Sequence, residues 1–350
     1  MSQNLQAIAE ALVAKGRGIL AADETPRTLT RRFQAHGLTC TAESRRSYRE
    51  MLFTAPGLAE FISGVILEDE TIRQSAATGV PLAQVLAAQG IVLGVKVDAG
   101  ARPFAGSPTE TVTEGLDGLR GRLEAYRALG ARFAKWRAVI HIGEGLPSRA
   151  CVLANAHALA RYAALCQEQH LVPIVQPEVL MDGPHSAQRC EEVTALVLHA
   201  VFDALIEADV VLEALLLEPN MVTAGSEAPV HGSVEEVAAA TLRTLRRRVP
   251  PAAPGIAFLS GGQDERLATA HLNAMRRAPG PTPWTLSFAY GRALQEPALA
   301  AWGGREQNLD AGRRALLHRA RCNSAACQGT YTEAMEATPP AARAERRVGR

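Results

Sequence analysis

The chain has 350 residues, of which 47% are hydrophobic, and a formal net charge of +1. This length allows one large domain or two ordinary ones, and the near-neutral charge gives no reason to expect nucleic acid or an anionic membrane as a partner. No apolar run reaches the roughly 20 residues of a membrane span, and the N-terminal stretch, which carries Glu10, is not expected to be a signal peptide.

Eight short apolar runs recur along the chain, and most are followed by a helical pattern. The first comes after an amphipathic N-terminal helix with Leu5, Ile8 and Leu12 on one face. The predicted strands are 18–22, 61–67, 91–97, 132–136, 172–175, 210–217, 255–259 and 285–288. The predicted helices between them include 31–51, 116–130, 150–169, 190–205 and 233–248. Eight strands that alternate with helices close a parallel sheet, so the sequence predicts an α/β fold, a single-domain (β/α)8 TIM barrel over residues 1–331.

The C-terminal stretch has a different composition. From Thr332 onward it consists mainly of Ala, Pro, Glu and Arg, with Met335 and Val348 as its large apolar residues. Such a segment cannot bury enough apolar surface to fold, so residues 332–350 are predicted to form a disordered tail. The six cysteines form no Cys-x-x-Cys pair. They are expected to be reduced thiols in the cytosol, and the sequence indicates no metal site.

Polar residues collect where the predicted strands end. In a parallel barrel these ends meet at one rim, which is where the chemistry of such folds takes place. The chain contains only three lysines, and two of them, Lys96 and Lys135, lie at strand ends. The full set at the rim is Asp23, Glu24, Lys96, Asp98, Lys135, Arg137, Gln176, Glu178, Glu218, Ser260 and Arg292. Any one of these could cap a helix or form a structural ion pair, but their gathering at one rim favours an active site.

Two glycine-containing turns follow the last two predicted strands. They are Ser260-Gly-Gly262 and Ala289-Tyr-Gly-Arg292, and a helical pattern follows each of them. Backbone N–H groups at helix N-termini suit a phosphate, and the loops after strands seven and eight are the usual phosphate site of such barrels. The sequence therefore predicts a phosphorylated ligand.

Long motifs in the same order resemble class I fructose-bisphosphate aldolases. The resemblance runs from about Leu5 to Tyr331, and the motifs that carry it are Gly16–Glu24, Gly94–Asp98, Phe133–Arg137, Val172–Glu178, Pro219–Val222, Leu259–Gln263, Tyr290–Leu294 and Ala301–Gly304. The resemblance implies a cytoplasmic homotetramer of glycolysis, without a cofactor, that cleaves fructose 1,6-bisphosphate into two triose phosphates. It implies no nucleic-acid or membrane partner.

The resemblance also implies roles for individual residues. Asp23 would assist proton transfer, and Glu178 would be a site carboxylate. Lys135 would lie near the reacting centre and, with Lys96 and Arg137, would bind the 6-phosphate end. The other substrate-binding residues would be Thr25, Thr28 and Arg32 at that rim, and Ser260, Gly261 and Arg292 at the 1-phosphate. Family members carry serine at the positions of Thr25 and Thr28.

Two departures from the family pattern concern the chemistry. The family's imine-forming lysine stands directly before Pro-Asn-Met, and this chain has Glu218 there. A carboxylate cannot form the imine that withdraws electrons from the breaking carbon–carbon bond. The family's glutamate that acts as acid and base is replaced by Gln176, whose amide does not exchange protons near pH 7. Family tails often end in a tyrosine that reaches the site, whereas the last tyrosine here is Tyr331.

Four interpretations follow. The chain binds a phospho-sugar with little or no aldolase activity, or it is an active lyase that uses the amine of Lys135. It is alternatively a metal-assisted enzyme in which Asp23, Glu178 and Glu218 hold a divalent ion, or a scaffold homologue that binds no sugar. The rim carries four cationic and three acidic side chains, which gives a net charge of +1. With the family's lysine and glutamate restored the net charge would be +2, so the sequence predicts weaker binding of a bisphosphate than the family pattern would give.

Overall fold

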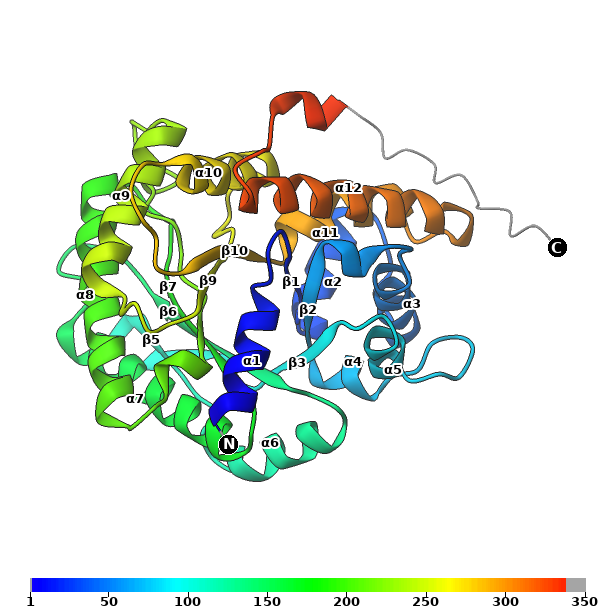
Figure 1. The fold of residues 1–350 in the computed structure, drawn as a ribbon, viewed down its shortest axis with the longest axis horizontal. Coiled ribbons are helices and arrows are strands. Elements are labelled where there is room, and N and C mark those ends of the chain that lie inside the picture. The colour runs from blue at the N-terminus through cyan, green and yellow to red at the C-terminus, as the bar shows by residue number, and fades with distance from the viewer. Residues whose placement is uncertain (1, 338–350) are drawn as a thin grey trace.

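The predicted apolar runs form a closed barrel of eight parallel strands in the computed structural model, which describes residues 2–337. Helices surround the barrel (Figure 1). The barrel strands are β1 (Gly18–Ala22), β2 (Ile62–Leu67), β3 (Val92–Lys96), β6 (Phe133–Ile140), β7 (Val172–Val179), β8 (Leu216–Leu217), β9 (Gly255–Phe258) and β10 (Thr285–Tyr290). β1 pairs with both β2 and β10 and so closes the sheet. The fold-class prediction is therefore confirmed.

Twelve α-helices are present in the described part of the chain. They are α1 (Ser2–Leu12), α2 (Pro26–Ala35), α3 (Ala42–Phe53), α4 (Asp69–Arg73), α5 (Leu82–Ala87), α6 (Leu119–Ala128), α7 (Arg149–Glu168), α8 (Ala187–Glu207), α9 (Val234–Arg248), α10 (Glu265–Arg277), α11 (Arg292–Trp302) and α12 (Leu309–Cys327). Short 3-10 helices are η1 (Leu58–Glu60), η2 (Leu212–Ala214), η3 (Glu306–Asn308) and η4 (Glu333–Ala337). None of the helices within residues 2–337 is both long and apolar enough to cross a bilayer.

The barrel interior is filled by side chains at the end where the strands begin. Leu5, Ala9 and Leu12 of α1 form a buried cluster with inward-facing residues of the strands, among them Phe133 and Ile174. Figure 1 shows α1 lying across the barrel. This helix therefore covers the amino end of the barrel. A larger apolar cluster fills the layer between the strands and the surrounding helices.

Two local predictions differ from the structure. The strand predicted at 210–217 is limited to Leu216–Leu217, because Gln167 of α7 hydrogen-bonds both the N–H and the carbonyl of Val211 and so holds this stretch against the helix layer. The helix predicted at 31–51 is two helices. The chain turns at Gly37, with a φ of 69°, and restarts at a capping box in which the Thr41 and Ser44 side chains each accept the other residue's backbone N–H.

The structure also contains a hairpin that the sequence pattern did not predict. β4 (Ala101–Phe104) pairs antiparallel with β5 (Ser107–Thr113) outside the barrel. At the other end of the chain, η4 covers the first part of the predicted tail, and its Met335 packs against the main apolar cluster. The rest of the predicted tail, residues 338–350, lies outside the described residues.

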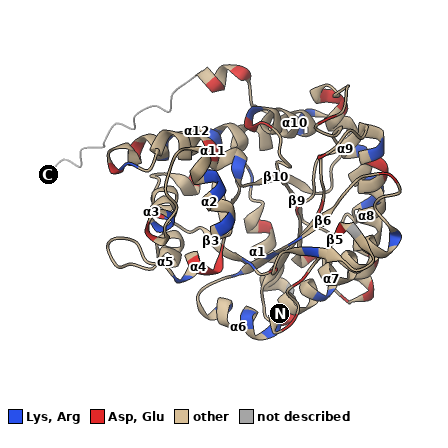
Figure 2. Ribbon diagram, turned by 180° about the vertical axis from the view of Figure 1, so that it is seen from behind, with Lys and Arg blue, Asp and Glu red and all other residues tan. Residues whose placement is uncertain are grey.

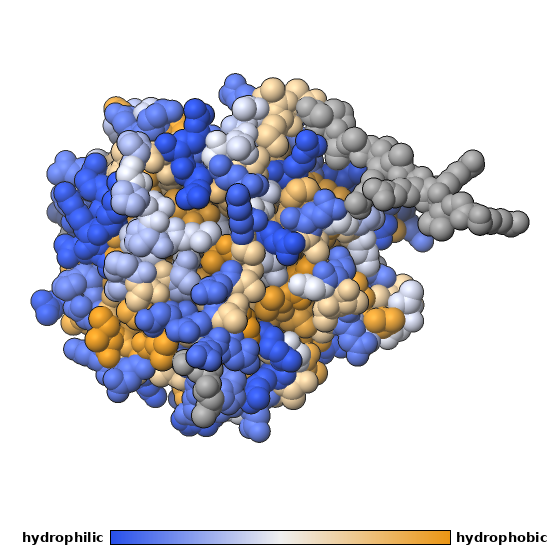
Figure 3. All heavy atoms as spheres, viewed as in Figure 1, coloured by the Kyte–Doolittle hydropathy of each residue, from blue (hydrophilic) through white to orange (hydrophobic). Residues whose placement is uncertain are grey.

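The charged and apolar surfaces are consistent with a barrel that opens at one rim. Basic residues gather on α2, next to the strand ends (Figure 2). The face shown in Figure 3 is mainly hydrophilic, with apolar patches between the polar side chains. The strand ends beside α2 are therefore the place to look for an anionic ligand.

Candidate active site

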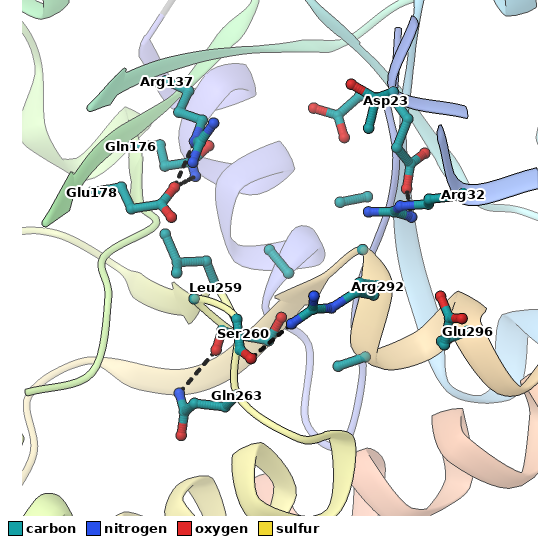
Figure 4. A pocket seen from close by; sticks show the side chains of 18 of the residues that line it. Asp23, Arg32, Arg137, Gln176, Glu178, Leu259, Ser260, Gln263, Arg292 and Glu296 are labelled. Carbon is teal, nitrogen blue, oxygen red and sulfur yellow. Dashed lines mark hydrogen bonds and ion pairs between the residues drawn. The ribbon is translucent and has the colours of Figure 1, made fainter. Parts of the chain in front are cut away.

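A cavity of about 880 Å³ opens at the carboxyl ends of the barrel strands. Figure 4 shows part of its wall, with side chains from several strands and from α2 pointing toward one another. All thirteen residues predicted for the site line this cavity: Asp23, Thr25, Thr28, Arg32, Lys96, Lys135, Arg137, Gln176, Glu178, Glu218, Ser260, Gly261 and Arg292. The barrel therefore brings together in space all thirteen residues predicted for the site, although it does not by itself assign their roles.

Lys135 lies between two carboxyl groups. Its Nζ is 3.3 Å from Oδ2 of Asp23 and 3.2 Å from Oε1 of Glu218. The three side chains come from β6, the end of β1 and the end of β8. Glu218 is the deepest, with 1% of its side chain exposed, whereas Asp23 is 13% exposed. A buried carboxyl group in contact with Lys135 therefore occupies the position at which the family resemblance implies a lysine.

The two carboxyl groups around Lys135 have opposite pKa shifts. Burial raises the pKa of Glu218 to about 8, because Lys135 offsets only part of the cost of desolvation and the Asp23 charge adds to it. Burial alone would raise the pKa of Asp23, but the positive charges of Lys135 and Lys96 have the larger combined effect and lower this pKa. Although burial alone would lower it, the acidic neighbours raise the pKa of Lys135 above its usual range. At pH 7 the three groups are a neutral acid, a carboxylate and an ammonium.

Glu178 is held by two donors at the next position along the rim. Arg137 Nε donates to its Oε2 at 2.6 Å, and Gln176 Nε2 donates to the same oxygen at 2.9 Å. The other amide atom of Gln176, Oε1, is buried without a hydrogen-bond partner in the described part of the chain, and so is Oε2 of Glu218. Two buried oxygen atoms without hydrogen-bond donors lower the stability of the fold. A proton on Glu218 would reduce this cost.

The loop after β9 is shaped to present backbone N–H groups. Gly261 and Gly262 both have positive φ angles, 58° and 90°, which glycine adopts without strain. Gln263 Nε2 donates to the Ser260 carbonyl at 3.0 Å, and its Oε1 lies 2.6 Å from Nδ1 of buried His271. This side-chain pair holds the loop in place from below.

The loop after β10 completes the same side of the cavity. Arg292, the first residue of α11, donates through Nη2 to the Gly262 carbonyl at 2.7 Å, and Figure 4 shows it directed toward the Ser260 loop. Gly291 precedes α11 and makes no side-chain cap. The first N–H groups of this helix are therefore available to an anion, as phosphate sites at helix N-termini require.

The α2 side of the cavity carries the remaining predicted residues. Thr25 caps α2 by accepting the Thr28 N–H at 3.3 Å, and the two hydroxyl oxygens are 3.2 Å apart. Arg32 forms a short ion pair with Glu24, which also binds buried Arg49 at 2.8 Å. Glu24 therefore positions Arg32. Sequence reasoning had noted Glu24 only as a rim residue, because its partners lie 8 and 25 positions away.

Several lining residues were absent from the predicted site. Arg31, Gly262 and Gln263 line the cavity beside residues that were predicted. Gly262 and Gln263 fall within a matched motif, so the motif was the signal that could have found them. No motif pointed to Arg31, because its neighbour Arg32 was predicted to be the substrate-binding arginine of α2.

Metal-binding geometry is found away from the cavity. Within residues 2–337, the one group whose potential ligand atoms all lie within 4.8 Å of one another is His318, Cys322 and Glu336, so Asp23, Glu178 and Glu218 are spaced more widely. Glu336 is already paired through both oxygens with Arg319, at 2.6 Å for Oε1. A fixed guanidinium at that distance opposes a cation, so this cluster serves to hold η4 against α12.

Known proteins are similar to this chain in sequence and in fold. The family model for class-I fructose-bisphosphate aldolases matches residues 4–346. A probable fructose-bisphosphate aldolase class 1 of Xanthomonas campestris is 53% identical over 94% of this chain and 98% of its own length. Fructose-bisphosphate aldolases of Dictyostelium discoideum and Drosophila melanogaster are 51% and 50% identical over 95% of this chain and 93% and 92% of theirs.

A solved structure gives the same result for the fold. Fructose-bisphosphate aldolase from Plasmodium falciparum, crystallised with TRAP and a small-molecule inhibitor, superimposes with a TM-score of 0.93 at 48% identity. The match covers 95% of this chain and 96% of that one. This chain belongs to the class I fructose-bisphosphate aldolase family.

Proposed function

We propose that this chain binds fructose 1,6-bisphosphate or a related phospho-sugar in the barrel cavity and does not cleave it through an imine. Family members act on phosphorylated sugars, and the loop of Ser260 to Gly262, the start of α11 and Arg292 supply donors for one phosphate. The contact of Lys135 with Glu218 is the observation that supports the absence of cleavage through an imine. A carboxyl group stands where the nucleophilic amine would be needed, and it binds the nearest amine.

An imine on Lys135 is the alternative that this contact disfavours. An amine attacks a carbonyl only after it loses its proton. Asp23 and Glu218 hold the Lys135 ammonium at 3.3 and 3.2 Å, and Asp23 raises the cost of removing its proton. A metal-assisted reaction is disfavoured by geometry, since the same ammonium stands between Asp23 and Glu218, where a shared cation would have to lie.

The charge of the site supports binding more strongly than the sequence alone indicated. With Glu218 neutral, the rim carries four cationic side chains (Lys96, Lys135, Arg137, Arg292) against the two carboxylates of Asp23 and Glu178. The net charge is then +2, which equals the value for the family's pattern with lysine and glutamate restored. A doubly phosphorylated sugar would meet the same formal charge as in a member that keeps the lysine.

Two measurements on the full-length protein test this proposal. In the first, fructose 1,6-bisphosphate is added and the melting temperature is followed, with fructose as the unphosphorylated control. In the second, the protein is treated with ketose phosphate and borohydride and its intact mass is measured. We expect a phosphate-dependent rise in melting temperature and no adduct. An adduct that maps to Lys135 would establish a relocated imine, and the absence of any shift would favour a scaffold homologue.

The cytoplasmic location and the homotetramer that the family resemblance implies belong to the same proposal. The six cysteines are all free thiols in the structure, as a reducing compartment requires. Sedimentation of the full-length chain, with and without the phospho-sugar, measures the oligomeric state directly.

A further inference from the structure

The groups around Lys135 form an acid and a base on either side of a fixed positive charge. Glu218 is the buried partner, and its pKa is raised to about 8, so it carries a proton at pH 7. Asp23 is the more exposed partner, and its pKa is lowered, so it is ionised. Two carboxyl groups whose environments push their pKa values apart are the usual basis of an acid and base pair. The lost imine lysine has thus been replaced by a different set of chemical groups.

We propose that this site catalyses imine-free enolisation of a phosphorylated triose, in which Asp23 is the base and Glu218 and Lys135 act on the carbonyl oxygen. The reaction class is proton transfer at the carbon beside a carbonyl, which leads to hydrogen exchange and to ketose–aldose isomerisation. The proposal rests on the phospho-sugar binding proposed above.

Each proton of this reaction has a place in the structure. The Asp23 carboxylate removes a proton from the hydroxymethyl carbon of a ketotriose phosphate, and the electrons of that C–H bond form a carbon–carbon double bond. The carbonyl π electrons move onto oxygen, which takes the proton of Glu218. The product is an enediol. Return of the Asp23 proton to the former carbonyl carbon, with the other enediol proton passing to Glu218, gives the aldose, so no oxidant or reductant is needed.

The donors are in position for the oxygen that becomes negative. Two hydrogen-bond directions of Lys135 go to Asp23 and Glu218, and its third N–H remains for a ligand. Glu218 lines the cavity, and its buried Oε2 has no hydrogen-bond partner within residues 2–337, so a rotation of the carboxyl group toward the cavity would present its proton to a ligand oxygen. A preorganised donor pair of this kind, directed at the oxygen that becomes negative, is the main means by which enzymes stabilise an enolate.

The other charged groups of the site favour the ionised form of Asp23 and the protonated form of Glu218. Lys96 on β3 acts on Asp23 and so helps to keep it ionised. Glu178 on β7 is a like charge that helps to keep Glu218 protonated, and Glu178 itself is held by Arg137 of β6. Asp98, at the end of β3, accepts the Arg137 N–H at 3.3 Å and its pKa is raised by burial. Asp23 is therefore the ionised carboxylate nearest to Lys135.

The experiment uses the full-length protein and dihydroxyacetone phosphate in deuterated water. Proton magnetic resonance follows the loss of the hydroxymethyl signal and the appearance of the aldose phosphate. We expect exchange that falls by about 10²–10⁴-fold in Asp23→Asn and in Glu218→Gln, the range of a general acid or base. Glu168→Gln, which changes an exposed partner of Arg120 in the same way, is expected to match the parent and so controls for a contaminating host isomerase.

Binding and chemistry are separated in the same samples by the shift in melting temperature with dihydroxyacetone phosphate. No shift would contradict the phospho-sugar proposal itself. A shift without exchange would overturn the enolisation alone and leave binding intact. Equal exchange in all four proteins would also overturn the enolisation, because a contaminant would then be responsible. Exchange together with a borohydride-trapped adduct would overturn it as well, because the reaction would then proceed through an imine. Exchange in the parent that decreases above about pH 8, as Glu218 ionises, would support it further.

Discussion

Lys135 Nζ and Oε1 of Glu218 are 3.2 Å apart at the end of the barrel, where the family resemblance implies an imine-forming lysine at the position of the buried carboxyl group. An isolated carboxylate at this depth would be very costly. The contact with the Lys135 ammonium and the retention of a proton both reduce that cost. The barrel therefore accommodates Glu218 without a change of fold, as the TM-score of 0.93 against an aldolase structure illustrates.

Restoring the family's groups should restore cleavage. The double variant Glu218→Lys with Gln176→Glu places an amine beside the Lys135 ammonium, and this like charge lowers the pKa of the introduced amine and makes it a better nucleophile. Losing a protease nucleophile costs about 10⁶ in rate, so we expect cleavage to rise by several orders of magnitude. The measurement is fructose 1,6-bisphosphate cleavage in a coupled assay, together with a borohydride adduct on the introduced lysine.

The matched control for that experiment is Glu218→Met with Gln176→Glu, which has a side chain of similar length and no amine. It should stay inactive. If the lysine variant binds the sugar but is equally inactive, the assignment of the rim residues is wrong, or the family's C-terminal tyrosine is required.

Glu218 should make the stability of the protein depend on pH. Between about pH 5 and pH 8 the unfolded chain has lost the Glu218 proton and the folded chain still holds it, so the free energy of unfolding falls as pH rises, by about 1.4 kcal/mol per pH unit. Glu218→Gln removes this term. The raised pKa of Lys135 and the lowered pKa of Asp23 act outside that window. Urea unfolding of both proteins at pH 5, 6, 7 and 8 should show a growing advantage of the variant, and parallel curves would refute the raised pKa.

Arg292 should contribute to phosphate affinity and little to the fold. It is largely exposed, and its guanidinium crosses from α11 to the Ser260 loop. Arg292→Ala removes a charge-assisted hydrogen bond worth about 1.5–3 kcal/mol, so the dissociation constant of a phospho-sugar should rise by roughly 10- to 100-fold. Arg314→Ala on the exposed face of α12 removes the same charge and should leave affinity unchanged. Calorimetric titration measures both, and equal losses would point to net charge rather than to contact.

Two glycine-to-alanine changes should have opposite effects on stability. A Cβ at Gly94 would lie 2.1 Å from the Phe133 ring, so Gly94→Ala overpacks the barrel interior and should cost about 1–3 kcal/mol. Gly121 lies on the exposed side of α6, and a Cβ there meets nothing within 4 Å. Gly121→Ala should stabilise the protein by about 0.5–1 kcal/mol, since glycine weakens a helix interior. Thermal unfolding distinguishes the two, and a neutral Gly94→Ala would mean that the Phe133 ring can move.

The barrel could be predicted from the sequence because its strands are short apolar runs separated by helical patterns. The strand that feeds Glu218 was overestimated, since the N–H and carbonyl of Val211 are bonded by Gln167 and Leu212–Ala214 forms the 3-10 helix η2. The β4–β5 hairpin was missed because Ala101–Phe104 is mostly exposed and has no apolar alternation. Apolar periodicity reports burial, and it cannot show which neighbour provides that burial.

The membership of the site could also be predicted, but its internal contacts could not. Residues at strand ends share one rim, and all thirteen expected residues line the cavity. Which of them touch depends on the tilt of the strands and on side-chain rotamers. The family resemblance placed Lys135 near the reacting centre and at the 6-phosphate end, and it did not show that Asp23 and Glu218 are its direct partners. The raised pKa of Glu218 follows from its burial and from the Asp23 charge, which together outweigh the contact with Lys135. Neither the depth of Glu218 nor its contacts can be read from spacing.

The position of α1 has a consequence for how a ligand comes and goes. Leu5, Ala9 and Leu12 close the amino end of the barrel, and Phe133 fills the interior above them. The cavity therefore has a single mouth. A sugar, the water that it displaces and anything released after a reaction must all pass the same rim, so entry and release use one opening. Residence time is then controlled by the residues at that opening, among them Arg32 and Arg292, and not by the barrel wall.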